Sequence, residues 1–295
     1  MVEPAPAHRR AGWLIPVLAV VVIAALLLVL VAGYFIGGVV AAANEDKHAA
    51  ATLESARKHN NQIYDALKTP KLPSSLSSAS DIGKARQAFS SYLTTLTDAD
   101  KTLDSDLKSL SDEDSRLKAD QGNLLLLPER SRLAADRERV SGMVSAFTNA
   151  KTAFKILRDQ IPVLQAFVDV IEGFDALAPF VDKEDWQGAL NALNQLSPKL
   201  QTLVTAASGP NVPPDFTNGV KLIKQLADDF KSFLQAVVGN DLATARSLSP
   251  KLDADIKALD QFDPSGIEAY EDNLLKPYKD AYEGGMKKAG FTVTG

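Results

Sequence analysis

Residues 82–117 read I-G-K-A-R-Q-A-F-S-S-Y-L-T-T-L-T-D-A-D-K-T-L-D-S-D-L-K-S-L-S-D-E-D-S-R-L, and an apolar residue stands at every seventh position. The residues of this register, continued to 124, are Ile82, Phe89, Leu96, Leu103, Leu110, Leu117 and Leu124. Ala85, Tyr92 and Ala99 supply a second seam position three residues after each of the first three. This heptad repeat predicts one helix of about 43 residues, ~65 Å long at ~1.5 Å per residue.

A matching seam follows a short L-L-L-P break that ends at Pro128. Its two registers are Leu133, Val140, Phe147, Phe154, Ile161 and Val168, and Met143, Ala150, Leu157, Leu164 and Ile171. Two long helices with matching seams and a short loop predict an antiparallel coiled-coil hairpin over residues 81–172. Pro162 is expected to kink or break the second helix.

The predicted seam becomes polar near the turn of this hairpin. Its second register there carries Asp106, Glu113, Asp120 and Asp136, and the basic residues of the second helix are Arg130, Arg132, Arg137 and Arg139. Opposite charges across the pair would fix its register. The thin apolar seam predicts that the turn is the least stable part. An alternative is that the run S-D-E-D at Ser111 caps a new helix and divides the first one.

The N-terminal part is apolar throughout, with no charged residue from Ala11 to Ala43. The stretch from Trp13 to Tyr34 would span ~32 Å as a helix, which matches the ~30 Å hydrocarbon core of a bilayer. Its two terminal aromatic residues suit the membrane interfaces. We therefore expect a cytoplasmic tail over 1–12 and a transmembrane helix over 13–36.

Flanking charge predicts the orientation of this segment. Arg9 and Arg10 precede it and Glu45 and Asp46 follow it, so the positive-inside rule places the N-terminus in the cytoplasm and the C-terminal domain outside. The alternative is a signal peptide cleaved near Ala43, which would release a secreted protein. Gly33 and Gly37 have the G-x-x-x-G spacing of close membrane-helix contacts, which makes a homo-oligomer through this face a candidate.

The rest of the chain is also expected to be helical. We predict a juxtamembrane helix over 44–70, a Ser-rich linker over 71–80, and a bundle of helical hairpins over 173–290. Pro277 is expected to split the last helical stretch, about 265–288. The predicted fold class is thus all-α: a single transmembrane helix, a long antiparallel coiled-coil hairpin and a helical bundle.

A degenerate repeat relates residues 174–207 to residues 230–259. Phe174, Val181, Asp185 and Ala189 match Phe230, Val237, Asp241 and Ala245 at an offset of 56. The string S-P-K-L occurs at 197–200 and again at 249–252, an offset of 52. Each copy would be a helical hairpin with a tight turn, but matches this short also arise by chance, so both interpretations stay open.

The composition argues against most chemistry. The chain has no cysteine, three histidines and a net charge of −5, so it offers no thiolate site and no basic face for nucleic acid. His48 and His59 are too far apart on one predicted helix to share a metal ion, and no nucleotide, zinc-protease or serine-hydrolase motif occurs. We therefore predict a non-enzymatic protein without a cofactor or metal.

Four aromatic residues are candidates for contact with a partner: Trp186, Tyr270, Tyr278 and Tyr282. Aromatic side chains beside cations such as Lys276 and Lys279 recur at interaction hot spots. The alternative is that these residues form the polar-tipped edge of a core.

The function expected from these features is a membrane-anchored extracytoplasmic scaffold. It would hold the bilayer through residues 13–36 and present its helical domain to a protein partner of the cell envelope. The alternative is a ligand-sensing helical ectodomain that signals through a membrane partner. An envelope hydrolase would need a site assembled from carboxylates that no motif indicates.

Overall fold

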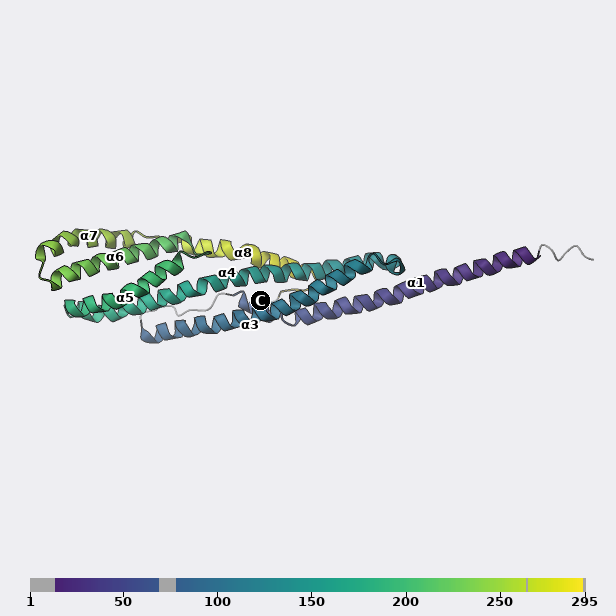
Figure 1. The fold of residues 1–295 in the computed structure, drawn as a ribbon, viewed down its shortest axis with the longest axis horizontal. Helices are drawn as coiled ribbons and strands as arrows, with labels where there is room; N and C mark the ends of the chain where they lie inside the picture. Colours follow the sequence, from purple (N-terminus) through teal and green to yellow (C-terminus); the bar gives the residue numbers. More distant parts are fainter. Residues whose placement is uncertain (1–13, 69–77, 264, 294–295) are drawn as a thin grey trace, which may run out of the picture.

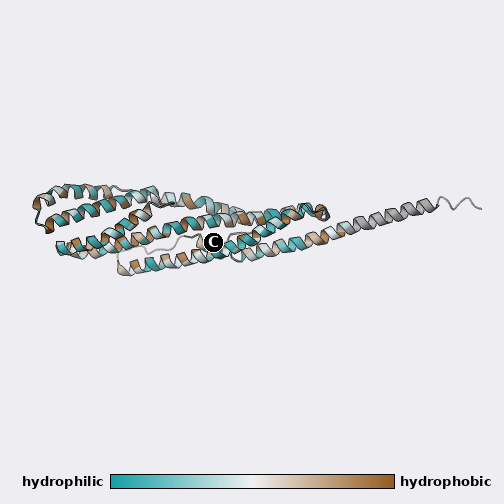
Figure 2. Cartoon of the chain, viewed as in Figure 1, coloured by the Kyte–Doolittle hydropathy of each residue, from teal (hydrophilic) through white to brown (hydrophobic). Residues whose placement is uncertain are grey.

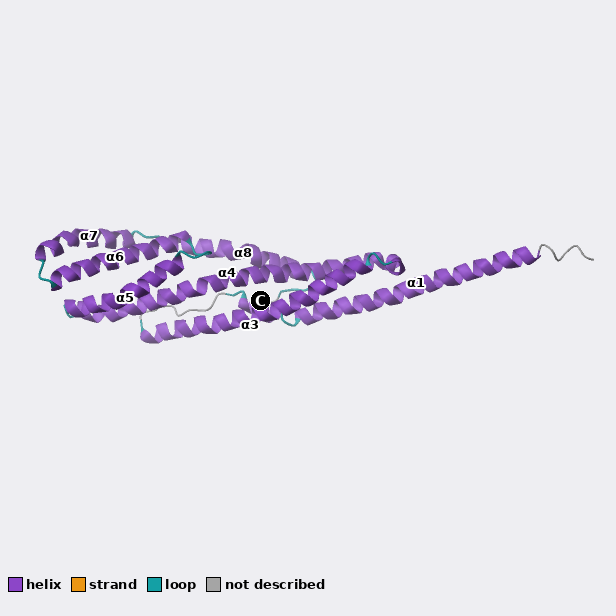
Figure 3. Cartoon of the chain, in the orientation of Figure 1, coloured by secondary structure: helices purple, strands orange, loops and turns teal. Residues whose placement is uncertain are grey.

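The computed structural model describes residues 14–68, 78–263 and 265–293, and it places most side chains from Ile36 onward. The described residues form helices and connecting turns, with no strand among them (Figure 3). The elements are α1 (Leu14–Arg57), α2 (Asn60–Ala66), α3 (Ala79–Asp120), the 3-10 helix η1 (Leu124–Glu129), α4 (Arg130–Asp182), α5 (Trp186–Ala207), α6 (Pro214–Val238), α7 (Leu242–Asp260) and α8 (Ser265–Lys288). The predicted all-α class and helical bundle are confirmed.

These helices lie nearly along one direction and build an elongated rod (Figure 1). α3 and α4 are antiparallel, α5 folds back on the C-terminal part of α4, and α6 and α7 continue the same back-and-forth packing. α8 then returns along α4. We call residues 117–133, where η1 joins α3 to α4, the tip. α1 packs beside the tip and runs on past it.

α3 forms where the heptad repeat predicts a helix. Its first-register residues from Ile82 to Leu117 are at most 2% exposed. The helix begins after Ser78, whose hydroxyl oxygen accepts a hydrogen bond from the Asp81 backbone N–H at 3.1 Å. It passes through Ser111 without interruption, so the alternative in which S-D-E-D starts a new helix is wrong.

Ion pairs cross between α3 and α4 along the length of the hairpin. From the far end toward the tip they are Arg86–Asp169 at 2.6 Å, Arg86–Glu172 at 2.9 Å, Arg158–Asp100 at 2.8 Å, Lys151–Asp104, and Arg137–Asp114 at 3.0 Å. Each step along α3 toward the tip is matched by a step back along α4, as an antiparallel register requires. Exposed pairs contribute only ~0.2–1 kcal/mol each, so the apolar seam holds the helices together and the charges disfavour slipped registers.

The tip is covered by a third helix that the heptad analysis of the hairpin did not anticipate. Ala42, Ala49, Ala56 and Ile63, on α1 and α2, lie seven residues apart and are at most 2% exposed in the same core as α3 and α4. The tip is therefore a three-helix contact and not a thin two-helix seam. The α1 register was missed because alanine is only a weak apolar signal.

The prolines do not divide the helices as the sequence predicted. α4 continues through Pro162 and α8 continues through Pro277, so the expected split at Pro277 is wrong and Pro162 does not break α4. A proline inside a helix removes one hydrogen bond and crowds the preceding turn, which costs ~3 kcal/mol. Around Pro162 the buried neighbours Ile161 and Val163 hold the chain in the helical path. Tertiary packing thus outweighs the local preference.

The predicted divisions of the chain differ from the observed ones in three places. The boundary at residue 172 falls inside α4, which supplies side chains to two apolar clusters. α8 packs against α4 in the first cluster through Leu275, Tyr282 and Met286, so it does not belong to the second bundle. The juxtamembrane stretch 44–70 is divided between α1 and α2, and most of the predicted linker lies outside the described residues.

The degenerate repeat has a structural counterpart in two turns of the same geometry. Glu184 and Asn240 both adopt a left-handed backbone, with φ of 55° and 56°. The next residues, Asp185 and Asp241, cap α5 and α7 by accepting from the backbone N–H three residues later, at 2.9 and 3.0 Å. Their own N–H groups donate to the carbonyls five residues earlier, at 2.9 and 2.8 Å. Every one of these contacts recurs at the offset of 56 seen in the sequence.

The S-P-K-L strings also occupy comparable places in the two hairpins. Lys199 on α5 pairs with Glu172 of the preceding helix at 3.2 Å, and Lys251 on α7 pairs with Asp229 of α6 at 2.6 Å. The offset of 52 is four residues shorter than that of the turns, which is about one helical turn. The S-P-K-L string therefore lies about one helical turn nearer to the preceding turn in the second hairpin than in the first.

The candidate membrane segment is only partly described. α1 is one helix from Leu14 to Arg57, but the side chains of residues 13–33, and so most of the predicted span 13–36, lie outside the described part. Where side chains are described, no helix combines the length and the apolar character needed to cross a bilayer.

α4 and α8 cross at two glycines. A Cβ atom at Gly285 would lie 2.5 Å from the Gly142 carbonyl oxygen and 2.7 Å from the Ala146 backbone nitrogen. Backbone atoms cannot move aside as flexible side chains do. Both helices therefore need glycine, whose side chain is a single hydrogen atom, at this crossing. Phe147 and Tyr282 stack beside it, with ring centroids 6.4 Å apart.

This crossing predicts opposite effects for two neighbouring glycines. Gly285→Ala should lower the free energy of unfolding by ~1–3 kcal/mol, because the new methyl group forces the two backbones apart. Gly284→Ala should leave it unchanged or raise it by up to ~1 kcal/mol, because a Cβ there meets nothing within 4 Å and alanine favours the helix. Urea unfolding followed by circular dichroism measures both, and equal effects of the two substitutions would contradict the packing.

Candidate functional site

The polar centre of the rod lies where α1 ends and α2 begins, at Lys58 and His59. His59 Nδ1 lies 2.8 Å from the Asp106 carboxylate, which occupies a seam position of α3. Burial raises the pKa of Asp106, and the hydrogen bond to His59 opposes that rise. The imidazole therefore compensates for a carboxylate placed where a coiled coil normally has an apolar residue.

The next residue, Asn60, extends this polar contact to the C-terminal helix. Its side-chain oxygen accepts a hydrogen bond of 2.5 Å from the hydroxyl of Tyr282, which is fully buried on α8. Burial raises the pKa of the Tyr282 hydroxyl, so it stays a protonated donor at neutral pH. On the α3 side, the Tyr92 hydroxyl donates to the Ala66 carbonyl at 3.0 Å. Three helices are thus joined around the α1–α2 break by buried hydrogen bonds.

A polar cleft of about 310 Å³ opens beside this junction. It is lined by Glu54, Arg57, Lys58, Asn60, Asn61, Met286, Phe291 and Thr292. The Arg57 guanidinium lies 5.4 Å from the centre of the Phe291 ring, which closes one side by a cation–π contact. The lining offers charges of both signs and amide groups, which suits a small polar molecule and not an apolar one.

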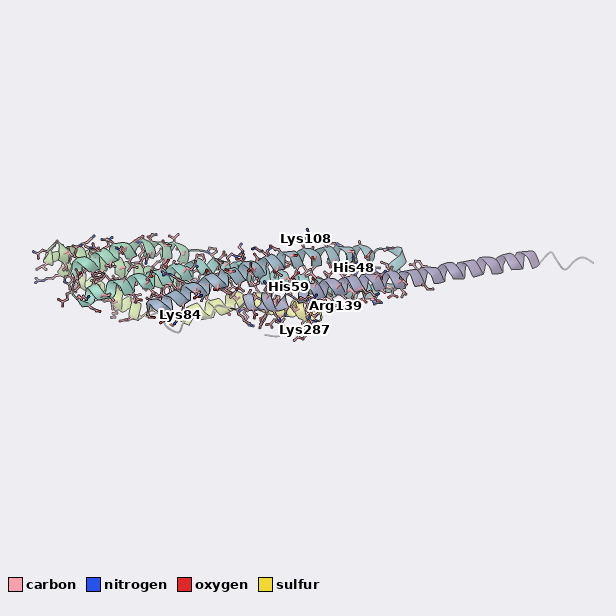
Figure 4. All side chains as sticks on the ribbon, turned by 90° about the horizontal axis from the view of Figure 1, so that it is seen from below. His48, His59, Lys84, Lys108, Arg139 and Lys287 are labelled. Atoms are coloured by element: carbon pink, nitrogen blue, oxygen red, sulfur yellow. The ribbon has the colours of Figure 1, made fainter. Side chains whose placement is uncertain are left out.

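The His59–Asp106 pair can be compared with the pairs found in catalytic sites. Among the described residues no hydroxyl or thiol is hydrogen-bonded to His59, so the His59–Asp106 pair has no adjacent nucleophile. The described part of the chain also contains no cluster of three metal-ligating side chains. His48 and His59 lie at different levels along the rod (Figure 4). The pair acts as a structural contact between α1–α2 and α3.

The four aromatic candidates do not form one surface. Tyr282 is 0% exposed, so its place in a surface patch is wrong. Tyr278 is half-buried against the same core, and Trp186 packs against the second cluster at the start of α5, away from α8. Tyr270 is partly exposed on α8. The heptad spacing of Leu275, Tyr282 and Ala289, all buried, was the signal that could have identified Tyr282 as core.

The proposed membrane-helix contact is described at one of its two glycines. Gly33 lies outside the residues whose surroundings are described. A Cβ at Gly37 would meet nothing within 4 Å, so that face of α1 is open in the single chain. Gly38, one position on, is buried where α1 packs at the tip.

Sequence reasoning missed an apolar surface at the tip. Ile36, Val39 and Val40 on α1 are 65%, 46% and 57% exposed, and Leu127 in η1 is 43% exposed. Figure 2 shows apolar residues both in the turn between α3 and α4 and on the adjoining part of α1. The run of four leucines at 124–127 was the available signal, since a polar turn would be the ordinary choice at the end of a hairpin.

Comparisons with known proteins give no guide to this chain, because no protein-family model, curated protein or solved structure matches it. The functional conclusions therefore depend on the residues and contacts described above.

Three buried carboxylates concentrate charge in the seam near the tip: Asp106, Glu113 and Asp136. Asp106 is hydrogen-bonded to His59, and Glu113 accepts a hydrogen bond of 2.9 Å from the Arg116 guanidinium. Asp136 is compensated least, because its Oδ2 is buried without a hydrogen-bond partner and Arg139 is 3.9 Å away. Burial and the nearby Asp46 raise the pKa of Asp136.

Asp136→Asn should therefore stabilise the protein in a pH-dependent way. When folding raises the pKa of a carboxyl group, the protein loses stability as pH rises through the folded-state pKa of that group. Below the unfolded-state pKa of ~4 the group is protonated in both states and does not lower the free energy of unfolding. The substitution should raise the free energy of unfolding by roughly 1 kcal/mol at pH 7, with the gain disappearing toward pH 4.

Thermal unfolding at several pH values measures this effect. Glu138→Gln, an exposed change on the same helix, is the control and should stay within ~0.5 kcal/mol at every pH. A gain for Asp136→Asn that did not depend on pH would show that ionisation of this carboxyl is not its cause.

Proposed function

We propose that this protein is a membrane-anchored, non-enzymatic scaffold of the cell envelope, with its N-terminus in the cytoplasm and its helical rod outside. The observation that best supports the proposal is the continuity of α1. It is a single helix from Leu14 to Arg57, and its C-terminal half is part of the main core through Ala42, Ala49, Leu53 and Ala56. The sequence of its first half is the apolar stretch expected to span the bilayer.

A scaffold benefits from such continuity because the rod is then held at a defined angle to its anchor. A flexible linker would let the domain reorient freely, whereas a continuous helix packed against α3, α4 and η1 transmits the tilt of the anchor to the rod. α4 alone has 53 residues and extends ~80 Å, so the far end is presented well away from the membrane.

The far end of the rod is the part best suited to a protein partner. The α4–α5 and α6–α7 turns both lie there (Figure 1). Phe180, Val238 and Leu242 at these turns are 37%, 40% and 56% exposed. Trp186, the one aromatic candidate in this region, is half-buried beside them. Apolar and aromatic side chains of this kind at the end of a rod are a suitable contact surface for another protein.

The proposed topology predicts which positions an impermeant thiol reagent reaches in intact cells. The chain has no cysteine, so single replacements report without interference. Lys108→Cys, at an exposed site on α3, should react with an impermeant maleimide in intact cells. His8→Cys should react only after the membrane is permeabilised. Labelling of His8→Cys in intact cells, or of both variants in a protein found only in the medium, would contradict the anchor and its orientation.

The polar cleft beside Asn60 favours a second candidate function, a ligand-sensing ectodomain. Its volume of about 310 Å³ and its charged lining suit a small polar molecule. The cleft lies between the end of α1 and the segment after α8, so a bound molecule would bridge the helix that leads to the anchor and the C-terminal end of the bundle.

Thermal-shift measurements with a panel of amino acids, dicarboxylates and sugar phosphates test this second function. A molecule present at a hundred times its dissociation constant stabilises the folded state by ~2.7 kcal/mol. The stabilisation should be lost in Arg57→Gln, which removes a charge from the lining, and kept in Lys108→Gln. Stabilisation that persists in Arg57→Gln would place the ligand elsewhere, and a panel without any effect would leave the scaffold as the better proposal.

A further inference from the structure

We infer that the tip is a second membrane contact, in which Leu127 and the adjoining apolar face of α1 rest in the headgroup layer of the bilayer that holds residues 13–36. The inference rests on the proposed function, since it needs the anchor. It adds that the hairpin itself touches the lipid beside that anchor.

The first support is the position of the exposed apolar side chains. Ile36, Val39 and Val40 follow the apolar segment directly, and Leu127 belongs to η1, which packs against α1. The turn between α3 and α4 and the adjoining part of α1 both lie at the end of the rod past which α1 runs on (Figures 1 and 2). Burying such side chains in lipid is favoured by the hydrophobic effect.

The fold holds Leu127 at the surface of the tip. Its neighbour Leu126 is 3% exposed and belongs to the main core, so it fixes η1 on the bundle. Leu127 remains 43% exposed. Burial of Leu126 thus holds Leu127 on the surface of the turn, and Leu127 can reach the lipid without a change of fold.

The second support is the height of the tip along α1. The Arg116–Glu45 ion pair at 2.9 Å places Arg116 of α3 at the same height along the rod as Glu45 of α1. Glu45 lies eleven residues, or ~16 Å, beyond Tyr34 along α1. From Arg116 the helix continues to Asp120, ~6 Å closer to the membrane, which leaves the turn within ~10 Å of the level of Tyr34.

For an upright anchor, that height places the turn just beyond the outer edge of the bilayer. The headgroup region adds ~5–8 Å to each side of the hydrocarbon core. Transmembrane helices tilt by ~20° on average, and a tilt toward the η1 side brings the turn into this layer.

The third support is the pairing of three arginines at or beside the tip, which weakens the electrostatic alternative, although Lys118 and Arg130 are not among these pairs. Arg116 pairs with Glu45 and Glu113, Arg132 with Asp46 and Arg137 with Asp114. Since these arginines are engaged by carboxylates of the same chain, they leave little positive field for anionic lipid. The contact should therefore be apolar and nearly independent of lipid charge.

A second contact would determine how the rod stands on the membrane. A single helix leaves rotation about its own axis free, whereas an off-axis leucine loop in the headgroup layer keeps one side of the rod toward the lipid. The long axis and the far end, with its exposed Phe180 and Leu242, would then be presented in one orientation to a partner.

The test uses the full chain reconstituted in phosphatidylcholine vesicles. Three single-cysteine variants, Leu127→Cys, Lys108→Cys and Val31→Cys, are labelled with an environment-sensitive fluorophore, and circular dichroism checks that each is folded. Quenching is measured with phosphatidylcholine carrying a shallow nitroxide and with aqueous iodide. Lys108 lies twelve residues, or ~18 Å, before the end of α3, so it reports the water-exposed rod. Val31 lies inside the expected span and reports the anchor.

We expect nitroxide lipid to quench the Leu127 probe at least about two-fold more than the Lys108 probe, with a blue-shifted emission, because leucine at an interface partitions toward lipid. The difference should remain when anionic lipid replaces a third of the phosphatidylcholine. If nitroxide lipid quenched the Leu127 probe no more than the Lys108 probe while it quenched the Val31 probe, the tip contact would be overturned and the anchor would stand. Absence of quenching at Val31 would overturn the proposed function itself.

Two further outcomes would also overturn the inference. Quenching at Leu127 that appears only with anionic lipid would show electrostatic docking through the arginines. A Leu127 probe shielded from both quenchers, in a protein whose mass is that of a dimer, would show that a second copy covers the tip.

Discussion

The structure depends on the burial of one long helix, α4, against helices on several sides. Its buried residues run from Leu133 to Leu177 and contribute to both apolar clusters. α3, α5 and α8 each pack along it, and α1 reaches its first turns. A helix of this length gains most of its stability from packing, so its uninterrupted course through Pro162 and Pro179 reflects the apolar contacts around it. Removing any one neighbour would expose a face of the same helix.

The polar residues inside the rod set its register more than they add to its stability. Asp106 meets His59, Asn60 meets Tyr282, and Glu113 meets Arg116. A slip of one heptad between the helices would leave Asp106 and Asn60 without their partners, which costs more than the hydrogen bond itself contributes, whereas Glu113 and Arg116 lie on the same helix and would stay together. Seams of leucine and alanine alone are tolerant of such slips, so the few polar pairs select one arrangement among several with similar apolar burial.

The proposed function is tied to two different parts of α1. Its C-terminal half carries small residues at heptad spacing and belongs to the core, whereas its N-terminal sequence is the apolar stretch expected in the bilayer. The surface between these parts, around Ile36 and Leu127, is apolar but lies outside the core. The proposed scaffold and the proposed tip contact both follow from this division of one helix, and the polar cleft beside Asn60 lies at its opposite end.

Patterns along the chain were enough to predict the helical class, the α3 helix, its partner seam in α4 and the turns of the two matching hairpins. Leucines and aromatics at seven-residue spacing, and Asp185 and Asp241 after their turns, are local signals with local causes. Only the tertiary structure decided that α1 covers the tip, that α8 returns to α4 and that Tyr282 is core. Those contacts join residues far apart in the chain, 86 positions for Asp46 and Arg132 and 222 for Asn60 and Tyr282, and depend on weak alanine and glycine signals. The close approach of Gly142 and Gly285 has meaning only once two helices cross, so no periodicity along one chain segment could reveal it.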